Sequence, residues 1–234
     1  MRLSDAETRF ICFGRMVTNV GMVVLIYGKS GSGKSRSLKN FAEDEIFLVN
    51  VERKALPFRK KFKYTLNTDN YTTIREQLAK MPLKVAVIDD AGYLITNTFM
   101  RGHSAGRGGS AVFDLYNDIA DLFWGLVKFC KDKLPEDVIV YFMMHEDTND
   151  SGETKLKTIG KLLDEKVNLP GMVTVCLRCV SRDGRHYFQT TTDGLDVTKS
   201  PEELFDSNEI DNDLKFVTDR IREYYELGGE ESNA

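Results

Sequence analysis

The feature that most constrains this chain is a glycine-rich stretch, GKSGSGKS, which spans Gly28 to Ser35. Two glycines separated by four residues and followed by lysine and serine form the phosphate-binding P-loop pattern. The apolar run MVVLIY before the loop predicts a buried strand, and the segment KSRSLKNFAE after it predicts a helix. In that context the backbone N–H groups converge on phosphate oxygens at the N-terminus of the helix. The sequence therefore predicts a site for a nucleoside triphosphate.

Within the loop, the pattern gives particular roles to two side chains. Lys34 is expected to reach the β- and γ-phosphates, and the Ser35 hydroxyl to ligate Mg²⁺. The expected nucleotide-binding residues are Gly28, Lys29, Ser30, Gly31, Ser32, Gly33, Lys34, Ser35 and Arg36.

A second nucleotide-binding motif lies in VAVIDD, where four apolar residues precede Asp89 and Asp90. This is the Walker B arrangement, in which a buried strand delivers a carboxylate to the Mg²⁺ shell. Asp89 is the expected metal residue, and Asp90 shares that role or orients the attacking water. An aspartate pair at a strand end is also a common turn or helix cap, but the P-loop upstream favours the Walker B interpretation.

Strand patterns alternate with helical patterns along the chain, which predicts an α/β fold with a mostly parallel sheet flanked by helices. We expect one domain over residues 1–234, with a core of about 20–226 and an acidic flexible tail of about 227–234. After the P-loop helix, the patterns predict strands at 46–52, 83–90 and 137–145, helices at 71–81, 111–131, 159–167 and 212–225, and a C-terminal β-hairpin around Asp183-Gly184. The connections at 95–112 and 145–157 are the expected ligand-binding loops, because they follow strand ends.

Composition says more about the environment in which the protein works than about the reaction it catalyses. The net charge is −4, so bulk electrostatics give no support to nucleic-acid binding, which would have to come from local patches. No apolar run is long enough to cross a bilayer and no signal-peptide pattern opens the chain, so we expect a cytoplasmic protein without membrane attachment.

Cys176 and Cys179 form a Cys-x-x-Cys within a predicted strand, where positions three apart point to opposite faces. Buried apolar cysteines are therefore expected there rather than a zinc site.

With these motifs in hand, the chain resembles a phage family of AAA/RecA-like nucleotide-binding proteins, the RecA-like P-loop ATPases of the Sak type. That family is linked to single-strand annealing and recombination. The resemblance covers most of residues 21–225 and rests on LIYGKSGSGKS, VNVE, VAVIDDAGYL, MMHEDT, ETKLKTIGKLLDEKV and the tail TKSPEELF…IDNDLKFV. It implies a RecA-like core, ATP as the nucleotide, single-stranded DNA as the substrate, a phage single-strand-binding protein as a partner, and a homo-oligomer.

The resemblance also implies roles for residues outside the two motifs. RecA-type ATPases carry a water-polarising glutamate where Glu52 stands, whereas AAA+ proteins carry it directly after the Walker B aspartate. This chain has a second aspartate, Asp90, at that AAA+ position, so the resemblance makes Glu52 the expected general base. His145 matches the strand-end sensor of the γ-phosphate, although RecA recombinases usually have an amide side chain there. Lys155 and Lys157 match lysines that complete the neighbouring subunit's ATP site in RecA-like filaments. A surface glutamate and two solvated surface lysines are the plain alternatives.

Two basic segments are candidates for contact with DNA. FRKKFKY interleaves Arg59, Lys60, Lys61 and Lys63 with aromatic residues, which suits phosphate contacts combined with base stacking. The second is the segment from Arg101 to Arg107. A solvated basic strand edge explains the first segment about as well.

Two other functions remain open from the sequence. A small-molecule or nucleotide kinase would use Arg101 and Arg107 as lid arginines, although the C-terminal hairpin and the short second strand ending in glutamate speak against it. An assembly factor would bind ATP and a partner protein but no DNA. A GTPase is excluded, because HEDTND follows YFMM where an Asn-Lys-x-Asp guanine-binding motif would be needed.

Overall fold

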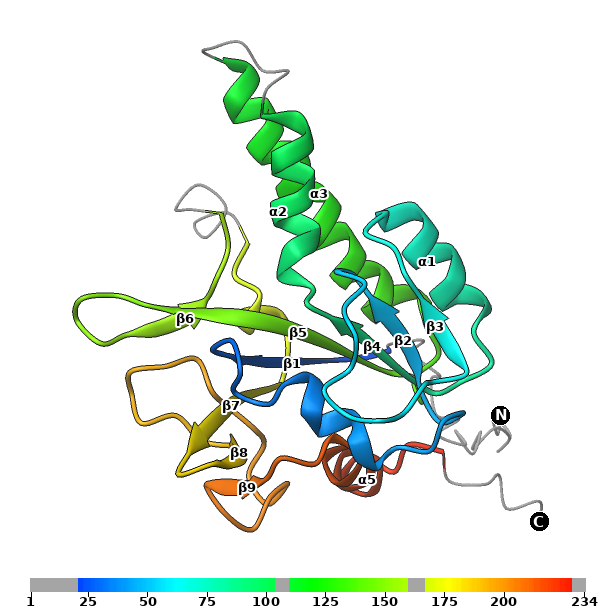
Figure 1. Cartoon of the computed structure of the whole chain (residues 1–234), viewed down its shortest axis with the longest axis vertical. Helices are drawn as coiled ribbons and strands as arrows, with labels where there is room; N and C mark the ends of the chain where they lie inside the picture. The colour runs from blue at the N-terminus through cyan, green and yellow to red at the C-terminus, as the bar shows by residue number, and fades with distance from the viewer. Residues whose placement is uncertain (1–20, 104–109, 160–166, 229–234) are drawn as a thin grey trace, which may run out of the picture.

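The structure is a computed structural model that describes residues 21–103, 110–159 and 167–228. The strands of these segments form a nine-stranded sheet in the order β3-β2-β4-β5-β1-β7-β8-β9, with β6 paired to β5 (Figure 1). Pairing is parallel from β3 to β7 and antiparallel for β7-β8, β8-β9 and β5-β6. The strands are β1 (Met22–Gly28), β2 (Phe47–Asn50), β3 (Tyr64–Leu66), β4 (Val85–Asp89), β5 (Ile139–Thr148), β6 (Thr154–Leu156), β7 (Val175–Arg182), β8 (Arg185–Gln189) and β9 (Glu209–Asp211).

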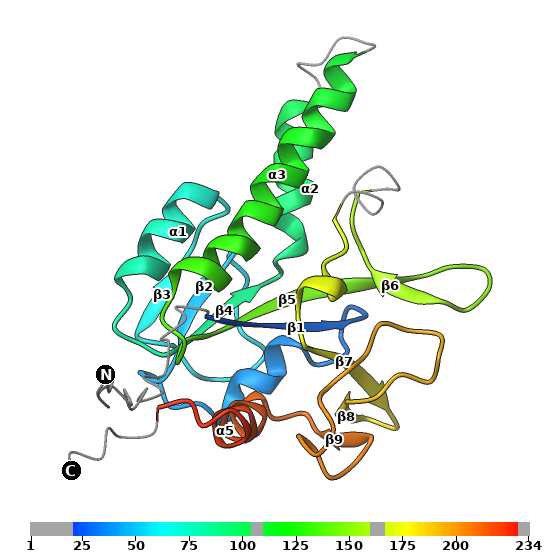
Figure 2. The ribbon, with the colours of Figure 1, turned by 180° about the vertical axis from the view of Figure 1, so that it is seen from behind.

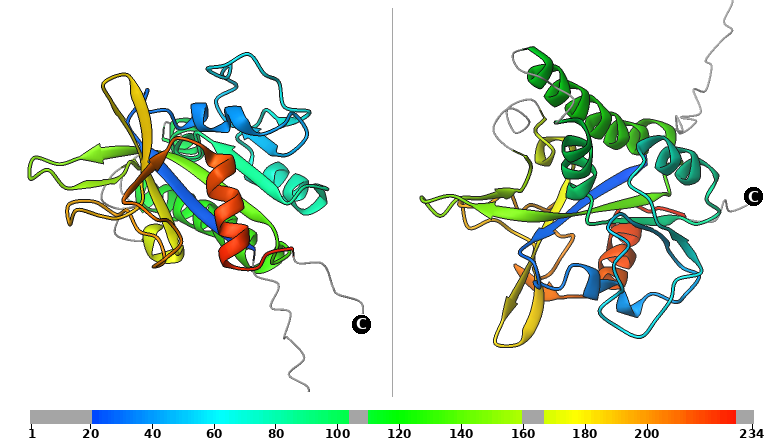
Figure 3. Two further views of the ribbon diagram at one scale, coloured as in Figure 1. Left: turned by 90° about the horizontal axis from the view of Figure 1, so that it is seen from below. Right: turned by 45° about the horizontal axis from the view of Figure 1, so that its top comes forward.

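Helices cover both faces of this sheet, as the views from opposite sides show (Figures 1 and 2). On one face lie α1 (Tyr71–Lys80), α2 (Gly92–Gly102) and α3 (Ser110–Lys133); on the other lie the 3-10 helix η1 (Ser35–Asn40) and α5 (Leu214–Tyr224). A second 3-10 helix, η2 (Pro170–Met172), precedes β7. Seen from below, α5 packs across the strands (Figure 3).

The central strands are apolar on both sides because both faces are covered. Residues of β1 alternate between two hydrophobic clusters: Leu25 packs with α1, α2 and α3, whereas Ile26 packs with η1 and α5. The backbone N–H groups in the first turns of α1 and α5 find local acceptors. They donate to the side-chain oxygens of the capping residues Asn70 and Asp213. Within the described part of the chain, no helix has the length and apolar character needed to cross a membrane.

The strand register explains how distant motifs meet. β5 lies between β1 and β4, and in the parallel ladder Gly28 is opposite His145, whereas Asn50 is opposite Asp89. The carboxyl ends of parallel strands share one edge of the sheet. The P-loop, His145 and the aspartate pair therefore lie along the same edge.

Most predicted elements are confirmed, including the parallel core, the helix that begins at Tyr71 and the hairpin at Asp183-Gly184. The cysteine prediction is also confirmed: Cys176 and Cys179 are buried in the clusters on opposite faces of the sheet. Residues 160–166 of the helix predicted at 159–167 lie outside the described residues. Arg107 lies outside them as well.

The helix predicted after the P-loop is present as the 3-10 helix η1, whereas two predicted loops are wrong. The connection at 145–157 is largely the β5-β6 hairpin. The connection at 95–112 is helical where it is described, apart from His103, because α2 and α3 pack together as an arm that extends from the sheet (Figure 1). A Cβ atom at Gly102 would lie 2.6 Å from the side chain of Leu115. This glycine therefore allows α2 to pack closely against α3, and it does not form a loop.

Candidate functional site

A cleft of about 550 Å³ opens at the edge of the sheet where the P-loop and the aspartate pair meet. Four parts of the chain form it: the P-loop with η1, the ends of β4 and β5, the turn that follows β2, and the start of β8. The lining residues are Ser30, Gly31, Gly33, Lys34, Ser35, Arg36, Lys39, Lys54, Ala55, Pro57, Phe58, Asp89, Asp90, His145 and His186.

The P-loop lysine is folded onto the loop. Lys34 is 6% exposed, and its Nζ donates hydrogen bonds of 2.8 and 2.9 Å to the carbonyl oxygens of Gly28 and Lys29. Burial lowers the pKa of Lys34, although the nearby thiol of Cys179 and the aspartates act in the opposite direction. An anion bound in the loop would offset this desolvation, which is what a phosphate-binding lysine requires.

The loop has further features that fit a phosphate. Gly31 and Gly33 have φ values of 78° and 106°, the left-handed region that glycine adopts without strain. The buried hydroxyl of Ser32 has no hydrogen-bond partner among the residues that the structure describes. A buried hydroxyl without a partner is costly, so a phosphate oxygen would satisfy it.

The Ser35 hydroxyl donates a 3.1 Å hydrogen bond to Oδ1 of Asp89, so the two expected Mg²⁺ residues are in contact. A hydroxyl and a carboxylate suit a hard cation that also keeps waters and phosphate oxygens as ligands. In the described segments, no group of three or more histidine, cysteine or acidic residues is placed to hold a metal alone. The donor set thus fits a Mg²⁺ ion that arrives with a nucleotide.

The two aspartates are in different electrostatic states. Burial and the neighbouring charge of Asp90 raise the pKa of Asp89 to about 6. Burial would also raise the pKa of Asp90, but hydrogen bonds from His145 and Lys54 outweigh it and lower that pKa. Asp90 has a φ of 57°, a strained conformation for a residue with a side chain, of the kind that clusters at functional sites.

His145 joins the lysine of the P-loop to the aspartate pair. Its Nδ1 lies 3.4 Å from Nζ of Lys34, and its Nε2 lies 3.3 Å from Oδ1 of Asp90. The other carboxylate oxygen of Asp90 forms an ion pair with Lys54, whose Nζ also lies 5.4 Å from the ring centroid of Tyr93. A continuous series of polar contacts therefore runs from the P-loop, through His145 and Asp90, to the turn after β2.

The C-terminal hairpin holds the P-loop from the other side. His186 on β8 and the thiol of Cys179 on β7 both contact the carbonyl oxygen of Ser32, at 2.7 and 3.1 Å. A side chain at Gly33 would come within 2.7 Å of the His186 ring, so only glycine fits there without displacing the hairpin. Asn212 extends the contact, because it donates to Cys179 and accepts from Arg36.

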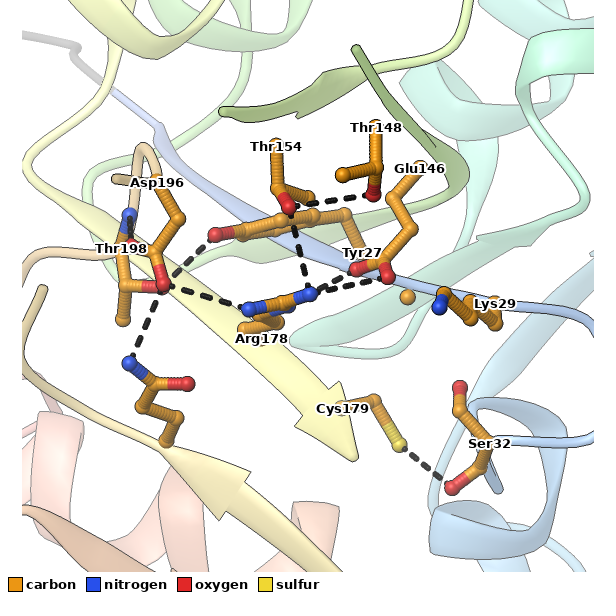
Figure 4. A network of polar contacts seen from close by, with 12 residues as sticks. Tyr27, Lys29, Ser32, Glu146, Thr148, Thr154, Arg178, Cys179, Asp196 and Thr198 are labelled. Atoms are coloured by element: carbon orange, nitrogen blue, oxygen red, sulfur yellow. Dashed lines mark hydrogen bonds and ion pairs between the residues drawn. The ribbon is translucent and has the colours of Figure 1, made fainter. Parts of the chain in front are cut away.

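A buried ionic network anchors the strand ends beside the P-loop (Figure 4). Arg178 donates to both carboxylate oxygens of Glu146, at 2.9 and 3.0 Å, and lies 3.5 Å from Asp196. Tyr27 and Thr198 share a 2.7 Å hydrogen bond in the same region. Because Glu146 directly follows His145 on β5, this network also fixes the position of His145 relative to β7.

Glu52 lies away from the cleft lining. Its Oε1 accepts a 2.9 Å hydrogen bond from Asn97 of α2, and Asn97 also donates to Asp69. The structure thus brings Lys34, Ser35, Asp89, Asp90 and His145 together, but it does not bring Glu52 into their cleft.

The basic candidates for DNA contact have different surroundings. Lys60 is half-buried and donates to the backbone carbonyl oxygens of Lys39 and Phe41, whereas the other three basic residues of the segment, Arg59, Lys61 and Lys63, are exposed. Phe62 is buried in the core, so its ring is not accessible to a base. Arg101 lies on α2 and forms a 2.5 Å ion pair with Asp69.

The two lysines expected to act on a neighbouring subunit lie at the β5-β6 hairpin. Lys155 is exposed on β6 opposite Asp147, and the backbone N–H of Lys157 donates to the carbonyl oxygen of His145 at 2.7 Å. Lys157 also lines a cavity of about 480 Å³ together with His145 and Lys54. Lys157 is thus next to residues of the nucleotide cleft of its own chain.

Lys54, Tyr93, Cys179, His186 and Asn212 were not among the residues predicted from the sequence. They come from separate elements: the turn after β2 (Lys54), α2 (Tyr93), the β7-β8 hairpin (Cys179 and His186) and the link between β9 and α5 (Asn212). Tertiary packing brings them to the site, and no periodic pattern in the sequence encodes that packing. The ERK tripeptide after the second strand was the available signal for Lys54, because it places a cation beside a strand end.

Comparison with known proteins assigns the chain to a domain family. No curated protein matches the chain. A solved structure described as a prototypical ATPase from the type III secretion system of pathogenic bacteria is similar, with a TM-score of 0.43 and 13% identity. The alignment covers 68% of this chain and 51% of the other, so this chain spans about half the length of that protein. Residues 20–202 match the model of the AAA domain, which is well over half of the sequence. On the strength of that match, the chain belongs to the AAA domain family.

Proposed function

We propose that this chain is an ATP- and Mg²⁺-dependent ATPase that acts on single-stranded DNA in phage recombination or single-strand annealing. The observation that carries the ATPase part is the convergence of Lys34, Ser35 and Asp89 in one cleft, with the serine and aspartate 3.1 Å apart. The DNA part rests on the resemblance to the Sak-type family and on the exposed basic residues beside the cleft. The proposed setting is the cytoplasm of the host cell.

In this cleft the side chains have separate tasks. Lys34 would exchange its carbonyl partners for phosphate oxygens, and Ser35 and Asp89 would hold Mg²⁺. The ion, when bound with the nucleotide, neutralises charge that develops on the phosphate oxygens. His145 contacts both Lys34 and Asp90, so it is placed to sense which partner the lysine has.

Two carboxylates are candidates for orienting the attacking water. Asp90 lines the cleft and is held in its ionised form by His145 and Lys54. Glu52 is the residue implied by the RecA resemblance, and its carboxylate is bound to Asn97. We favour Asp90, because a general base must come within hydrogen-bond reach of the water it activates.

DNA contact is proposed for the exposed basic residues of the turn after β2, Arg59, Lys61 and Lys63, with Arg101 as a further contact. Phe58 and Lys54 belong to the same turn and line the nucleotide cleft. DNA bound to this turn would therefore be adjacent to the ATP site. A homo-oligomer and a phage single-strand-binding protein are the proposed partners.

The kinase alternative is less well supported by the geometry. Its lid would use Arg101 on the nucleotide, whereas Arg101 pairs with Asp69 and is not among the residues that line the cleft. The assembly-factor alternative uses the same cleft and differs only in the partner.

The test is the rate of phosphate release from MgATP with and without single-stranded DNA. The proposal expects slow basal hydrolysis that rises when single-stranded DNA is added. Phosphate transfer to an added nucleoside or nucleotide would indicate a kinase. ATP binding with no DNA binding and no stimulation would indicate an assembly factor.

A further inference from the structure

Lys54 occupies a position at the nucleotide cleft that neither sequence motif includes. It follows β2 on the turn that forms one wall of the cleft, and its side chain lines both that cleft and the neighbouring cavity that contains Lys157. Among the lysines that line the cleft, it is the one that the described structure pairs with Asp90.

The contacts of Lys54 are those of a side chain that can change partners. Its side chain is 57% exposed, whereas that of Asp90 is 11% exposed. An ion pair with so exposed a lysine contributes little to stability, because water and salt screen it. Asp90 has a second partner in His145 at 3.3 Å, so departure of the lysine would not leave the carboxylate without a partner.

A bound triphosphate would compete directly with Asp90 for this lysine. The terminal phosphate carries more negative charge than a carboxylate and offers several acceptor oxygens. Asp90 directly follows Asp89, which contacts the Ser35 hydroxyl, so Lys54 lies next to the part of the cleft where the Mg²⁺ and the terminal phosphate would lie. A diphosphate has no group at that position.

We propose that Lys54 exchanges Asp90 for the terminal phosphate of a bound nucleotide, and thereby makes the site prefer triphosphates over diphosphates. Tyr93, whose ring lies beneath the ammonium group, limits how far the side chain can move from the cleft when it changes partner. The proposal rests on the proposed function, since it requires ATP to bind in this cleft. The proposal adds to that function a residue that distinguishes a bound triphosphate from a bound diphosphate.

The experiment is a calorimetric measurement of affinity for a slowly hydrolysed ATP analogue and for ADP, each with Mg²⁺. Lys54→Met, which keeps the apolar stem, is expected to weaken binding of the analogue by about tenfold and to change ADP binding by less than about twofold. Lys54→Arg, which keeps the charge, is expected to retain the preference. Lys54→Met losing both nucleotides equally, or neither, would overturn the proposal.

Asp90→Asn gives an independent readout, because it removes the resting partner of Lys54. It is expected to strengthen binding of the analogue by about threefold in the wild-type background and to have no such effect in the Lys54→Met background. The same gain in both backgrounds would overturn the exchange. Absence of nucleotide binding in the wild-type chain would overturn the proposed function as well, so the two failures are distinguishable.

Discussion

The hydroxyl of Ser35 lies 3.1 Å from Oδ1 of Asp89, at the base of the nucleotide cleft. Burial and the charge of Asp90 raise the pKa of Asp89 to about 6, above its usual value of 3.8. A raised pKa in the folded state stabilises the protein below the unfolded value, and this contribution is lost as the pH rises through about 6. The ionised site therefore lowers stability at neutral pH until a cation binds.

Asp89→Asn is expected to raise the free energy of unfolding of the nucleotide-free protein by about 1–3 kcal/mol at pH 7. The amide oxygen still accepts the hydrogen bond from Ser35, but it carries no buried charge. Urea unfolding at pH 7 and pH 4 measures the effect, which should largely disappear at pH 4. A variant that is less stable than the wild type at pH 7 would show that the carboxylate is stabilising as it stands.

Asp90→Asn is expected to keep ATP bound and to reduce hydrolysis by about 10²–10⁴-fold, the usual contribution of a positioned base. Glu52→Gln is the matched control, since its carboxylate contacts Asn97 rather than the cleft, and it should cost less than about tenfold. Single-turnover hydrolysis separates chemistry from binding. The reverse ranking would place this site with RecA-type ATPases.

Replacing the exposed residues Arg59, Lys61 and Lys63 together with Gln is expected to weaken single-strand binding and to flatten its dependence on salt. The slope of log K against log salt should fall by about 0.7 for each lost phosphate contact, hence by about 2. Lys60 is left unchanged because it holds the backbone of η1. Gln at Lys80 and Lys133, two exposed lysines elsewhere, is the control; equal slopes in both variants would remove this segment from the interface.

How far the sequence predicts this molecule depends on the kind of signal. The buried strands at Met22 and Val85 carry continuous apolar runs, and turn residues such as Asp183-Gly184 act locally, so these features were predictable. Gly102 lies in a segment whose glycines predict a loop, because its actual role depends on contact with Leu115 of another helix, which no local pattern shows. Lys54 and His186 reach the site only through tertiary packing, and no periodicity reports that. The P-loop and Walker B residues were found because backbone geometry imposes their spacing.

Mixing two inactive subunits tests whether ATP sites are shared between neighbours. Lys34→Ala disables a subunit's own site, and Lys155→Ala/Lys157→Ala disables only its contribution to a neighbour. The mixture is expected to hydrolyse ATP faster than either variant alone, since a cation supplied by a docked neighbour stabilises the developing charge. Because Lys157 lines a cavity with His145 of its own chain, a mixture as inactive as its parts would instead assign these lysines to their own subunit or to the surface.

The most direct measurement of the central claim is steady-state phosphate release from MgATP as single-stranded DNA is titrated in, compared with duplex DNA of the same sequence. Lys34→Ala is the control for contaminating ATPases, because loss of the P-loop lysine should abolish turnover in a folded protein. The account predicts a saturable increase in rate with single-stranded DNA, a much smaller one with duplex, and none in the variant. A rate that is the same with and without single-stranded DNA, or that persists in Lys34→Ala, would contradict it.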